Sequence, residues 1–306
     1  MTTARRIFCV FALAWSPDGA QLAVGGTGTT VRILDAATLK TRLIYRGHAA
    51  LIKSLAWSPD GRYVVSAGED HHIHIWSPDD GTLAAVFPLQ WPQAVAWSPC
   101  SDLIAASSYS GTVELWKAGG WVPFCTLPGG AASLAWSPDG RRLAAGRTGG
   151  VRIFTIEGIG LDRNLTCRSL TYALALSWAP DGGRLAVGGN NPEAVEIWDM
   201  TTEAPIDAPN VTYRGHRFYV WSVDWSPNSE LIASGSWEEV HLWHPSTGDL
   251  LANFPIHANE IYALAWSPDG TRIASGGRDR TIQVWNTGPA GLHANATLSA
   301  KVGECL

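Results

Sequence analysis

Two sets of side chains in this sequence have the composition of a nucleophilic catalytic centre. They are His48, Ser66 and Asp70, and His257, Ser275 and Asp279, with the same spacings of 18 and 4 residues. A histidine that takes a serine proton while an aspartate orients its ring is a usual arrangement for acyl transfer. Because the set recurs in register and each Asp stands in a predicted turn, we interpret both sets as buried hydrogen-bonded networks that fix strand register.

Other residues that could bind a metal or a phosphate give weaker patterns. His71, His72 and His74 are the densest group of possible metal ligands, but one strand with its neighbour rarely completes a metal site, so we expect no metal. The glycine-rich residues 25–28 and 188–191 lack the GK[ST] and GxGxxG patterns and are interpreted as turns. HExxH, GxSxG and EF-hand patterns are absent from the sequence. We expect no cofactor and no enzymatic activity.

Composition indicates a globular protein without a surface for polyanions. The chain has 306 residues, of which 46% are hydrophobic and 16% charged, and its net charge is −5. Phosphate neutralisation needs a basic stripe, so nucleic acid is not an expected partner. Five scattered cysteines without a CxxC pair suit a reducing compartment. With no 18-residue apolar run and no signal-peptide core, we expect a cytoplasmic protein with no membrane contact.

A short phrase recurs seven times and predicts the architecture. Its tryptophans are Trp15, Trp57, Trp97, Trp136, Trp178, Trp225 and Trp266, at steps of 42, 40, 39, 42, 47 and 41 residues. This period is typical of four short strands per unit. Such a unit cannot bury both its faces alone, so the units must stack radially. We therefore predict one all-β domain over residues 1–306. It would be a seven-bladed β-propeller with four antiparallel strands per blade, the blades starting near residues 9, 50, 90, 130, 171, 218 and 259.

The second unit contains the sequence motifs of a known family. It reads Gly47-His48, then Ala56-Trp57-Ser58-Pro59-Asp60-Gly61, then Ser66, Asp70 and Trp76, and Gly215-His216 opens a further unit. This resembles the WD-repeat family, and the regular phrases look like those of bacterial tandem WD-repeat proteins. The resemblance is specific for the fold and unspecific for function.

The resemblance implies a hydrogen-bonded tetrad of His, Ser, Asp and Trp within a blade. Two units match it: His48, Ser66, Asp70 and Trp76, and His257, Ser275, Asp279 and Trp285. A third unit has His216, Ser234 and Trp243, but Glu238 or Glu239 stands where Asp would be, which puts that tetrad in doubt. The remaining units lack the tetrad and must depend more on apolar packing.

The resemblance also implies which face binds partners. Partners of such proteins usually sit where loops enter the innermost strands and where the second strand turns into the third. By register this face includes Phe11, Lys53, Glu69, Trp91, Tyr109, Arg147, Tyr172, Tyr219, Trp221, Trp237, Glu260, Tyr262 and Arg278. Eight of the twenty-one positions selected in this way are aromatic, against 10% of the whole chain. Aromatic residues with a few arginines are typical of interface centres. The alternative is that some rings only pack against each other in the channel.

These patterns favour a monomeric, non-catalytic scaffold that binds a protein or peptide. The mixed charges of the face suit an amphipathic peptide, and an aromatic cage for a methylated Lys or Arg is a narrower variant. A second hypothesis is a sensor module or subunit of a larger bacterial signalling or defence assembly. A propeller hydrolase would need several channel ligands, and Glu69 and Glu260 are the only acids at the selected positions. We expect residues 292–299 to form the outer strand of the last blade.

Overall fold

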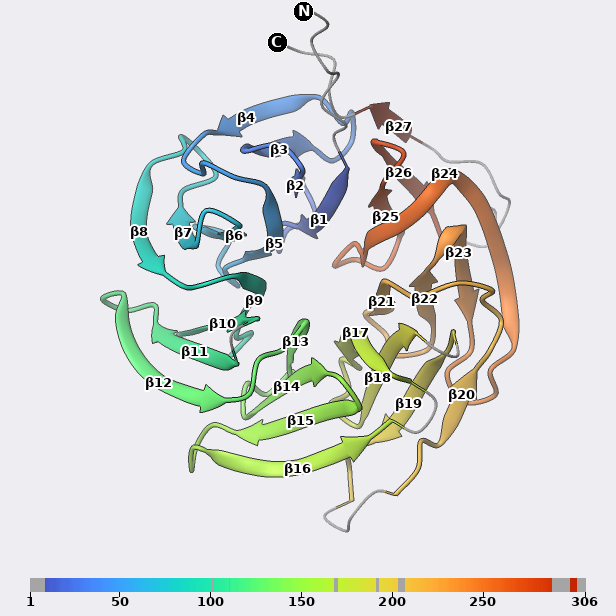
Figure 1. The fold of residues 1–306 in the computed structure, drawn as a ribbon. Coiled ribbons are helices and arrows are strands. Elements are labelled where there is room, and N and C mark those ends of the chain that lie inside the picture. Colours follow the sequence, from blue (N-terminus) through green and yellow to red (C-terminus); the bar gives the residue numbers. More distant parts are fainter. Residues whose placement is uncertain are drawn as a thin grey trace, which may run out of the picture.

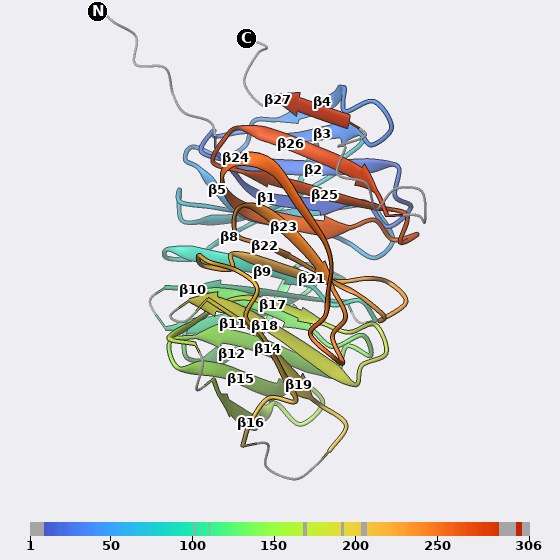
Figure 2. The ribbon, with the colours of Figure 1, turned by 90° about the vertical axis from the view of Figure 1, so that its right-hand side faces the viewer.

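The computed structural model describes residues 9–100, 102–109, 111–167, 170–190, 193–202, 207–287 and 298–301. In this part of the chain, twenty-seven strands and no helix surround a central channel, which gives a β-propeller (Figures 1 and 2). None of the described residues forms a helix with the length and apolar character that crossing a membrane requires. The expectation of an all-β fold is confirmed.

Five antiparallel four-stranded sheets follow one another, each ordered from the channel to the rim. The first two are β1–β4 (Val10–Trp15, Gln21–Gly26, Val31–Asp35, Thr41–Tyr45) and β5–β8 (Ile52–Trp57, Val64–Gly68, His72–Trp76, Leu83–Pro88). The next two are β9–β12 (Pro92–Trp97, Leu103–Ser108, Thr112–Lys117, Val122–Pro128) and β13–β16 (Ser133–Trp136, Arg142–Arg147, Gly150–Thr155, Gly160–Thr166). The fifth is β17–β20 (Tyr172–Trp178, Arg184–Asn190, Val195–Asp199, Val211–Tyr213).

The last part of the ring differs from the predicted separate four-stranded units, because it is one seven-stranded sheet. Its strands are β21–β27 (Ser222–Trp225, Ile232–Gly235, Trp237–Trp243, Leu250–Trp266, Arg272–Gly277, Thr281–Asn286, Leu298–Lys301). The long strand β24 pairs with β23 through residues 250–255 and with β25 through residues 261–266. Ile256 stands where Gly47 and Gly215 precede the histidine in other units. A side chain there favours a continuous extended backbone over a turn.

The C-terminal segment supplies the outermost strand of this sheet. β27 pairs with β26 from Thr281 opposite Lys301 to Val284 opposite Leu298. The sequence predicts this strand over residues 292–299, of which 292–297 lie outside the described residues, and the described strand continues to Lys301. Leu298 and Ala300 pack against the apolar cluster that joins β25 and β26 to β1 and β2.

The repeated phrase is a hydrogen-bonded turn after each innermost strand. In the first sheet Ser16 Oγ accepts the Gln21 N–H at 2.9 Å, and Asp18 Oδ1 accepts the Ala20 N–H at 3.0 Å. Gly19 closes the turn with a φ of 69°, which a glycine adopts without steric cost. Ser, Asp and Gly are therefore favoured at these positions, which explains why the phrase recurs.

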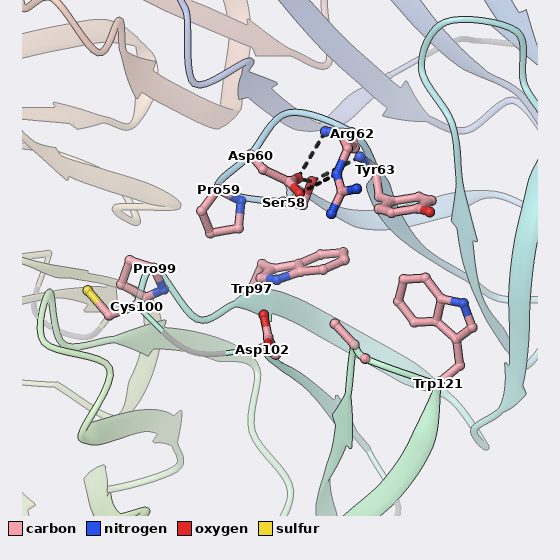
Figure 3. A pocket seen from close by; sticks show the side chains of 12 residues that line it. Ser58, Pro59, Asp60, Arg62, Tyr63, Trp97, Pro99, Cys100, Asp102 and Trp121 are labelled. Atoms are coloured by element: carbon pink, nitrogen blue, oxygen red, sulfur yellow. Dashed lines mark hydrogen bonds and ion pairs between the residues drawn. The ribbon is translucent and has the colours of Figure 1, made fainter.

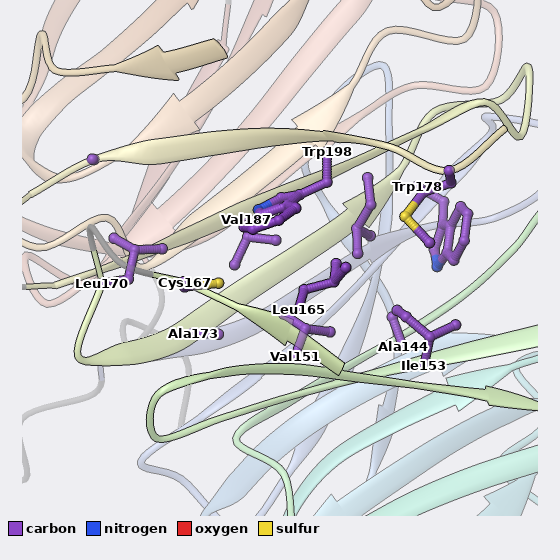
Figure 4. Packing of buried hydrophobic residues seen from close by; sticks show 13 residues of the cluster. Ala144, Val151, Ile153, Leu165, Cys167, Leu170, Ala173, Trp178, Val187 and Trp198 are labelled. Carbon is purple, nitrogen blue, oxygen red and sulfur yellow. The ribbon is translucent and has the colours of Figure 1, made fainter. Parts of the chain in front are cut away.

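The core lies between neighbouring sheets. Trp178 and Trp198 of the β17–β20 sheet pack on Val151, Ile153 and other apolar residues of the β13–β16 sheet (Figure 4). Five phrase tryptophans also donate their indole N–H to a carbonyl oxygen of the preceding sheet, at 3.0–3.2 Å. These pairs are Trp15 with Ala265, Trp57 with Ala14, Trp136 with Ala96, Trp178 with Ala135, and Trp225 with Ser177. The same type of contact thus holds the ring together and closes it between β1 and β24.

Candidate functional site

One residue of each innermost strand segment, four positions before the phrase tryptophan, lines the mouth of the central channel. These residues are Phe11, Lys53, Gln93, Ala132, Leu174, Trp221 and Tyr262. Five of the seven stand at a shift of strand register: Phe11, Lys53, Gln93, Leu174 and Tyr262. A β-bulge leaves one residue out of the ladder and turns its side chain away from the regular alternation. The bulges therefore aim these side chains at the channel.

Four rings at this mouth form a continuous series, which we call the aromatic ladder. Tyr219 contacts Trp221 with ring centroids 5.8 Å apart, Trp221 contacts Tyr262 at 5.5 Å, and Tyr262 contacts Phe11 at 5.1 Å. These separations are within the range of favourable aromatic pairs. The ladder runs from the segment that enters β21 across β24 to β1, so its members come from both ends of the chain.

Charged residues extend the ladder at one end and flank its middle. Lys53 Nζ lies 5.5 Å from the centroid of Phe11 and 3.0 Å from Glu69 Oε1. Arg278 and Glu260 form an ion pair at 2.9 Å beside Tyr262. Burial, and then the charge of Glu260, raise the pKa of the Tyr262 hydroxyl, so it remains a neutral hydrogen-bonding group. The ladder thus presents apolar rings between two neutralised charge pairs.

The remaining predicted face residues lie apart from the ladder in the described structure. Trp237 contacts Phe218 at 5.4 Å and pairs with Glu260 across β23 and β24, and both rings are exposed. Trp91 packs edge-on against His71 at 4.6 Å. Tyr109, Tyr172 and Arg147 are exposed, and no ring contact joins them to the ladder among the described residues. The structure therefore gathers about half of the predicted aromatic face into one surface.

The first predicted tetrad is connected throughout. His48 Nδ1 lies 2.8 Å from Asp70 Oδ2, His48 Nε2 lies 2.7 Å from Ser66 Oγ, and the indole of Trp76 donates to Ser66 Oγ at 3.1 Å. Burial acts to raise the pKa of Asp70, but the Ala49 amide and His48 outweigh it and lower that pKa. Ser66 is fully buried, so no substrate can reach its hydroxyl. This geometry supports a structural network over nucleophilic catalysis.

The second predicted tetrad lacks the expected hydrogen bond from its tryptophan. His257 lies 2.8 Å from Asp279 and 2.6 Å from Ser275, but Trp285 Nε1 is buried without a hydrogen-bond partner among the described residues. The expectation that Trp285 joins the hydrogen-bonded chain is therefore wrong. Trp285 instead packs against Phe254.

The doubtful third set lacks a carboxylate on its histidine. His216 Nε2 lies 2.7 Å from Ser234 Oγ, and Trp243 donates to the same oxygen at 3.0 Å. His216 Nδ1 is buried without a partner among the described residues, because Glu239 lies 3.1 Å from His241 instead.

A tyrosine that the sequence analysis did not single out joins neighbouring sheets. Tyr45 ends β4, and its hydroxyl lies 2.7 Å from Nδ1 of His74 in β7. Its ring stacks on Trp76 at 4.3 Å, and His74 stacks on His48 at 3.9 Å. Tyr213 makes the same contact with His241 at 2.7 Å. The sequence Tyr-Arg-Gly-His, which precedes both units, is the feature from which this contact could have been predicted.

The histidine-rich segment directs its three rings to different partners. His71 Nδ1 accepts the Trp91 N–H at 3.1 Å, His72 Nδ1 lies 2.8 Å from the Asp70 carbonyl oxygen, and His74 binds Tyr45. Donor atoms of His48, Asp70 and His74 do lie within 4.8 Å of one another. Both nitrogens of His48 and Nδ1 of His74 already take part in hydrogen bonds. The arrangement therefore fits a hydrogen-bonded network better than a metal site.

Comparison with known proteins gives a family model and several relatives. The model described as WD domain, G-beta repeat matches residues 6–35, 39–77, 90–117, 121–155, 208–244 and 248–286. Residues 156–207, which include most of the β17–β20 sheet, are not matched, although the sequence resemblance was extended to that unit.

Three relatives illustrate the range of proteins that this chain is similar to. A WD repeat-containing protein 26 homolog of Drosophila melanogaster is 26% identical over 94% of this chain and 46% of its own length. Actin-interacting protein 1 of the same species is 26% identical over 62% of this chain and 32% of its own. Cell division cycle 20.1, a cofactor of the APC complex in Arabidopsis thaliana, is 30% identical over 78% and 44%.

The chain spans about half the length, or less, of these curated relatives. They come from an animal and a plant, which gives no support to the expected likeness to bacterial tandem proteins. The family model, in contrast, covers well over half of the described strands in six separate matches. The chain therefore belongs to the WD-repeat family.

Proposed function

We propose that this protein is a non-catalytic scaffold that binds a protein or peptide on the aromatic ladder. The observation that carries the proposal is the unbroken contact of Tyr219, Trp221, Tyr262 and Phe11 around one side of the channel mouth. Rigid rings supply contact area at a small cost in conformational entropy. A series of four offers a long apolar anchor site.

The surroundings of the ladder support a peptide with mixed polarity. Lys53 with Glu69, and Arg278 with Glu260, provide both charges at the edge of the apolar surface. Tyr219 is 43% exposed and Phe218 is 52% exposed, so the end of the ladder at β21 is open to a partner. Interfaces typically combine such an aromatic centre with a polar rim.

We propose further that the ring has seven blades. The lining of the channel by seven strand segments supports this count, with the two halves of β24 serving as the outer strand of one blade and the inner strand of the next. The shared strand would couple these two blades more tightly than a turn does. It also brings Glu260, at the middle of the shared strand, next to both Trp237 and Arg278.

A second candidate function is a recognition module within a larger protein or assembly. The relatives are longer proteins, and this supports the candidate: the chain matches only 46% of the length of one relative and 44% of the length of another. The names of two relatives refer to actin and to the APC complex, which are protein partners. We extend to this chain only the general property of binding a protein.

The test is selection of peptides that bind the wild-type chain, followed by affinity measurement on variants. A Tyr219→Ala/Trp221→Ala double variant, which removes two rings of the ladder, should weaken binding by at least about tenfold, because removal of a central aromatic residue commonly costs about 2 kcal/mol or more. Leu83→Ala, an exposed residue of the rim strand β8, is the matched control and should bind as the wild type does. All three chains should first be shown to melt at similar temperatures. Equal binding by the double variant would place the site elsewhere.

A further inference from the structure

A second aromatic site lies on the opposite face of the ring from the ladder. Residues of the turn between β5 and β6, the end of β9 with its following turn, and the turn between β11 and β12 line a cavity of about 440 Å³ between two sheets. Because successive strands are antiparallel, the turns after the innermost strands lie at the end of the channel away from the loops that enter those strands. The cavity is therefore separate from the proposed partner surface.

The same position at other sheet interfaces shows what the phrase tryptophan prefers as a neighbour. The guanidinium of Arg142 lies 4.8 Å from the ring of Trp178, that of Arg184 lies 4.5 Å from Trp225, and that of Arg272 lies 4.6 Å from Trp15. Each arginine comes six residues after the phrase tryptophan of the preceding sheet. Three of the seven interfaces are thus closed by a cation over the tryptophan face, with an arginine from the chain itself.

The interface between the β5–β8 and β9–β12 sheets has no arginine over its phrase tryptophan, and the Arg62 guanidinium instead lies 6.0 Å from the ring of Tyr63. The residue six positions after Trp57 is Tyr63, whose ring lies parallel to Trp97 at the longer distance of 6.5 Å. Trp97 is half-buried, whereas the six other phrase tryptophans are buried. The following turn also departs from the repeated phrase, because Cys100 stands where the Asp of Ser-Pro-Asp-Gly stands elsewhere.

A third ring completes three sides of the cavity. Trp121 lies edge-on to Tyr63 at 5.2 Å and edge-on to Trp97 at 6.3 Å, and Figure 3 shows the three rings around the hollow. Trp121 has a φ of 55°, a conformation that is unusual for a bulky side chain. Glycine fills the equivalent position of two other sheets, at Gly81 and Gly248 with φ of 77° and 78°. Two further sheets have Leu39 and Ile159 at this position, with φ of 55° and 39°, so Trp121 is the aromatic member of a set that otherwise holds glycine or an aliphatic residue.

The charges at the cavity favour a positive ligand. Arg62 is paired with Asp60, with its Nε 2.6 Å from Asp60 Oδ2, so these two charges offset each other. Burial raises the pKa of Asp60, but the Ser58 hydroxyl and Arg62 outweigh it and lower that pKa to about 2. Asp102 also lines the cavity and its carboxylate has no hydrogen bond or ion pair among the described residues. One uncompensated negative charge therefore stands beside the three rings.

We infer that this cavity binds a methylated ammonium group, which takes the place that arginine occupies at three other interfaces. Aromatic rings attract a cation over their faces through their quadrupoles, and a methylated ammonium loses less hydration than a free amine when it enters an aromatic site. The Asp102 carboxylate supplies the counter-charge. The group can belong to a free quaternary amine or to a methylated lysine side chain of a protein, since both present the same head group to the rings.

Binding can be measured by titrating choline into the full chain while following the indole N–H signals of the tryptophans by NMR. Choline should saturate the shifts of Trp97 and Trp121, and its neutral isostere 3,3-dimethylbutanol should bind at least about tenfold more weakly, because only the cation interacts with the ring quadrupole. A peptide with one trimethyl-lysine is the second probe. Tighter binding of the peptide than of choline assigns the site to a protein side chain, and equal binding assigns it to a free amine.

Two variants remove the site while leaving the fold in place. Tyr63→Arg should close the cavity with the chain's own cation, as Arg184 closes the cavity at Trp225, and should abolish choline binding. Trp121→Gly should also abolish choline binding, and the better fit of glycine to the φ at that position should offset part of the packing that is lost from the neighbouring apolar cluster. The matched control is Ile159→Gly, at the equivalent turn of the β13–β16 sheet with a φ of 39°, and it should bind as the wild type does.

The inference is overturned if choline produces no saturable shift, if dimethylbutanol binds equally well, or if Trp121→Gly and Ile159→Gly bind choline alike. None of these results bears on the aromatic ladder, since the Tyr219→Ala/Trp221→Ala variant leaves the cavity intact. Asp102→Asn provides a graded check, because removal of the counter-charge should weaken choline binding several-fold and leave dimethylbutanol binding unchanged.

Discussion

The hydroxyl of Tyr45 lies 2.7 Å from Nδ1 of His74, although the two residues belong to different sheets. Both side chains are buried, so each satisfies the other's polar atom where water cannot. Burial raises the pKa of Tyr45 to about 12 and lowers that of His74 to about 4, so both are neutral at pH 7. The hydrogen bond is therefore part of the contact between sheets.

Tyr45→Phe should lower the free energy of unfolding by about 1–3 kcal/mol, because it leaves a buried imidazole nitrogen unpaired while the ring keeps its packing on Trp76. Urea denaturation measures the difference. Tyr109→Phe is the control, since Tyr109 is 82% exposed, and it should be neutral. If Tyr45→Phe is as stable as the wild type, the hydrogen bond is not a stabilising contact.

Acid should destabilise the fold through its buried histidines, against an opposing contribution from Asp224, whose pKa burial raises to about 6. Burial lowers the pKa of His48, His74, His216 and His241, which stack in two pairs. An unfolded histidine titrates near its ordinary value of 6.5, so below that pH the unfolded chain binds more protons than the folded chain. The free energy of unfolding should therefore fall as the pH falls from about 6.5 to about 4, by about 3 kcal/mol from His74 alone. Urea titrations across this range measure the loss.

The same titrations with His74→Gln separate this histidine from the others. Glutamine can still accept the Tyr45 hydrogen bond but does not titrate, so the dependence on pH should become shallower. His244→Gln, outside the stacked pairs, should keep the wild-type slope. An unchanged slope in His74→Gln would show that His74 does not contribute to acid destabilisation.

Two phrase tryptophans form a matched pair for measuring one hydrogen bond. Trp57 donates its indole N–H to the Ala14 carbonyl at 3.0 Å, whereas Trp266 Nε1 is buried without a partner among the described residues. Replacement by Phe removes a similar ring volume at each site. Trp57→Phe should therefore cost about 1 kcal/mol more than Trp266→Phe, because only the first loses a hydrogen bond. Thermal or urea denaturation of the two variants gives the difference, and equal losses would contradict it.

The sequence predicts the strands and the phrase turns well, because Ser, Pro, Asp and Gly each have a local role in the turn. It does not predict that β24 is continuous, since this depends on the extended backbone around Ile256 as well as on pairing with two different neighbours. The regular spacing of the phrase predicts only separate four-stranded units. The register of the innermost strands does identify the positions of Phe11 and Tyr262, but not the bulges that aim them at the channel.

The aromatic cavity was missed because its rings belong to three different turns and strand ends. Tyr63 follows the phrase of one unit, Trp97 is the phrase tryptophan of the next, and Trp121 stands in a later turn. A comparison of the position six residues after each phrase tryptophan shows arginine in three units and Tyr63 as the one aromatic residue among the other four. That signal has meaning only when the ring stacking across the interface is known.

The outer strand β27 should be needed for a stable, monomeric ring. A chain that ends after Thr287 leaves β26 as an unpaired edge and removes the contacts of Leu298 and Ala300 with the core. An exposed edge strand pairs readily with other chains, so this truncation should melt at a lower temperature and form aggregates. Thermal denaturation and light scattering after size-exclusion chromatography measure both effects. A chain that ends after Lys301 keeps β27 and should match the full-length protein. If the shorter chain also remains monomeric with an unchanged melting temperature, β27 does not protect the edge, and closure of the ring depends on the contacts of β1 with β24 alone.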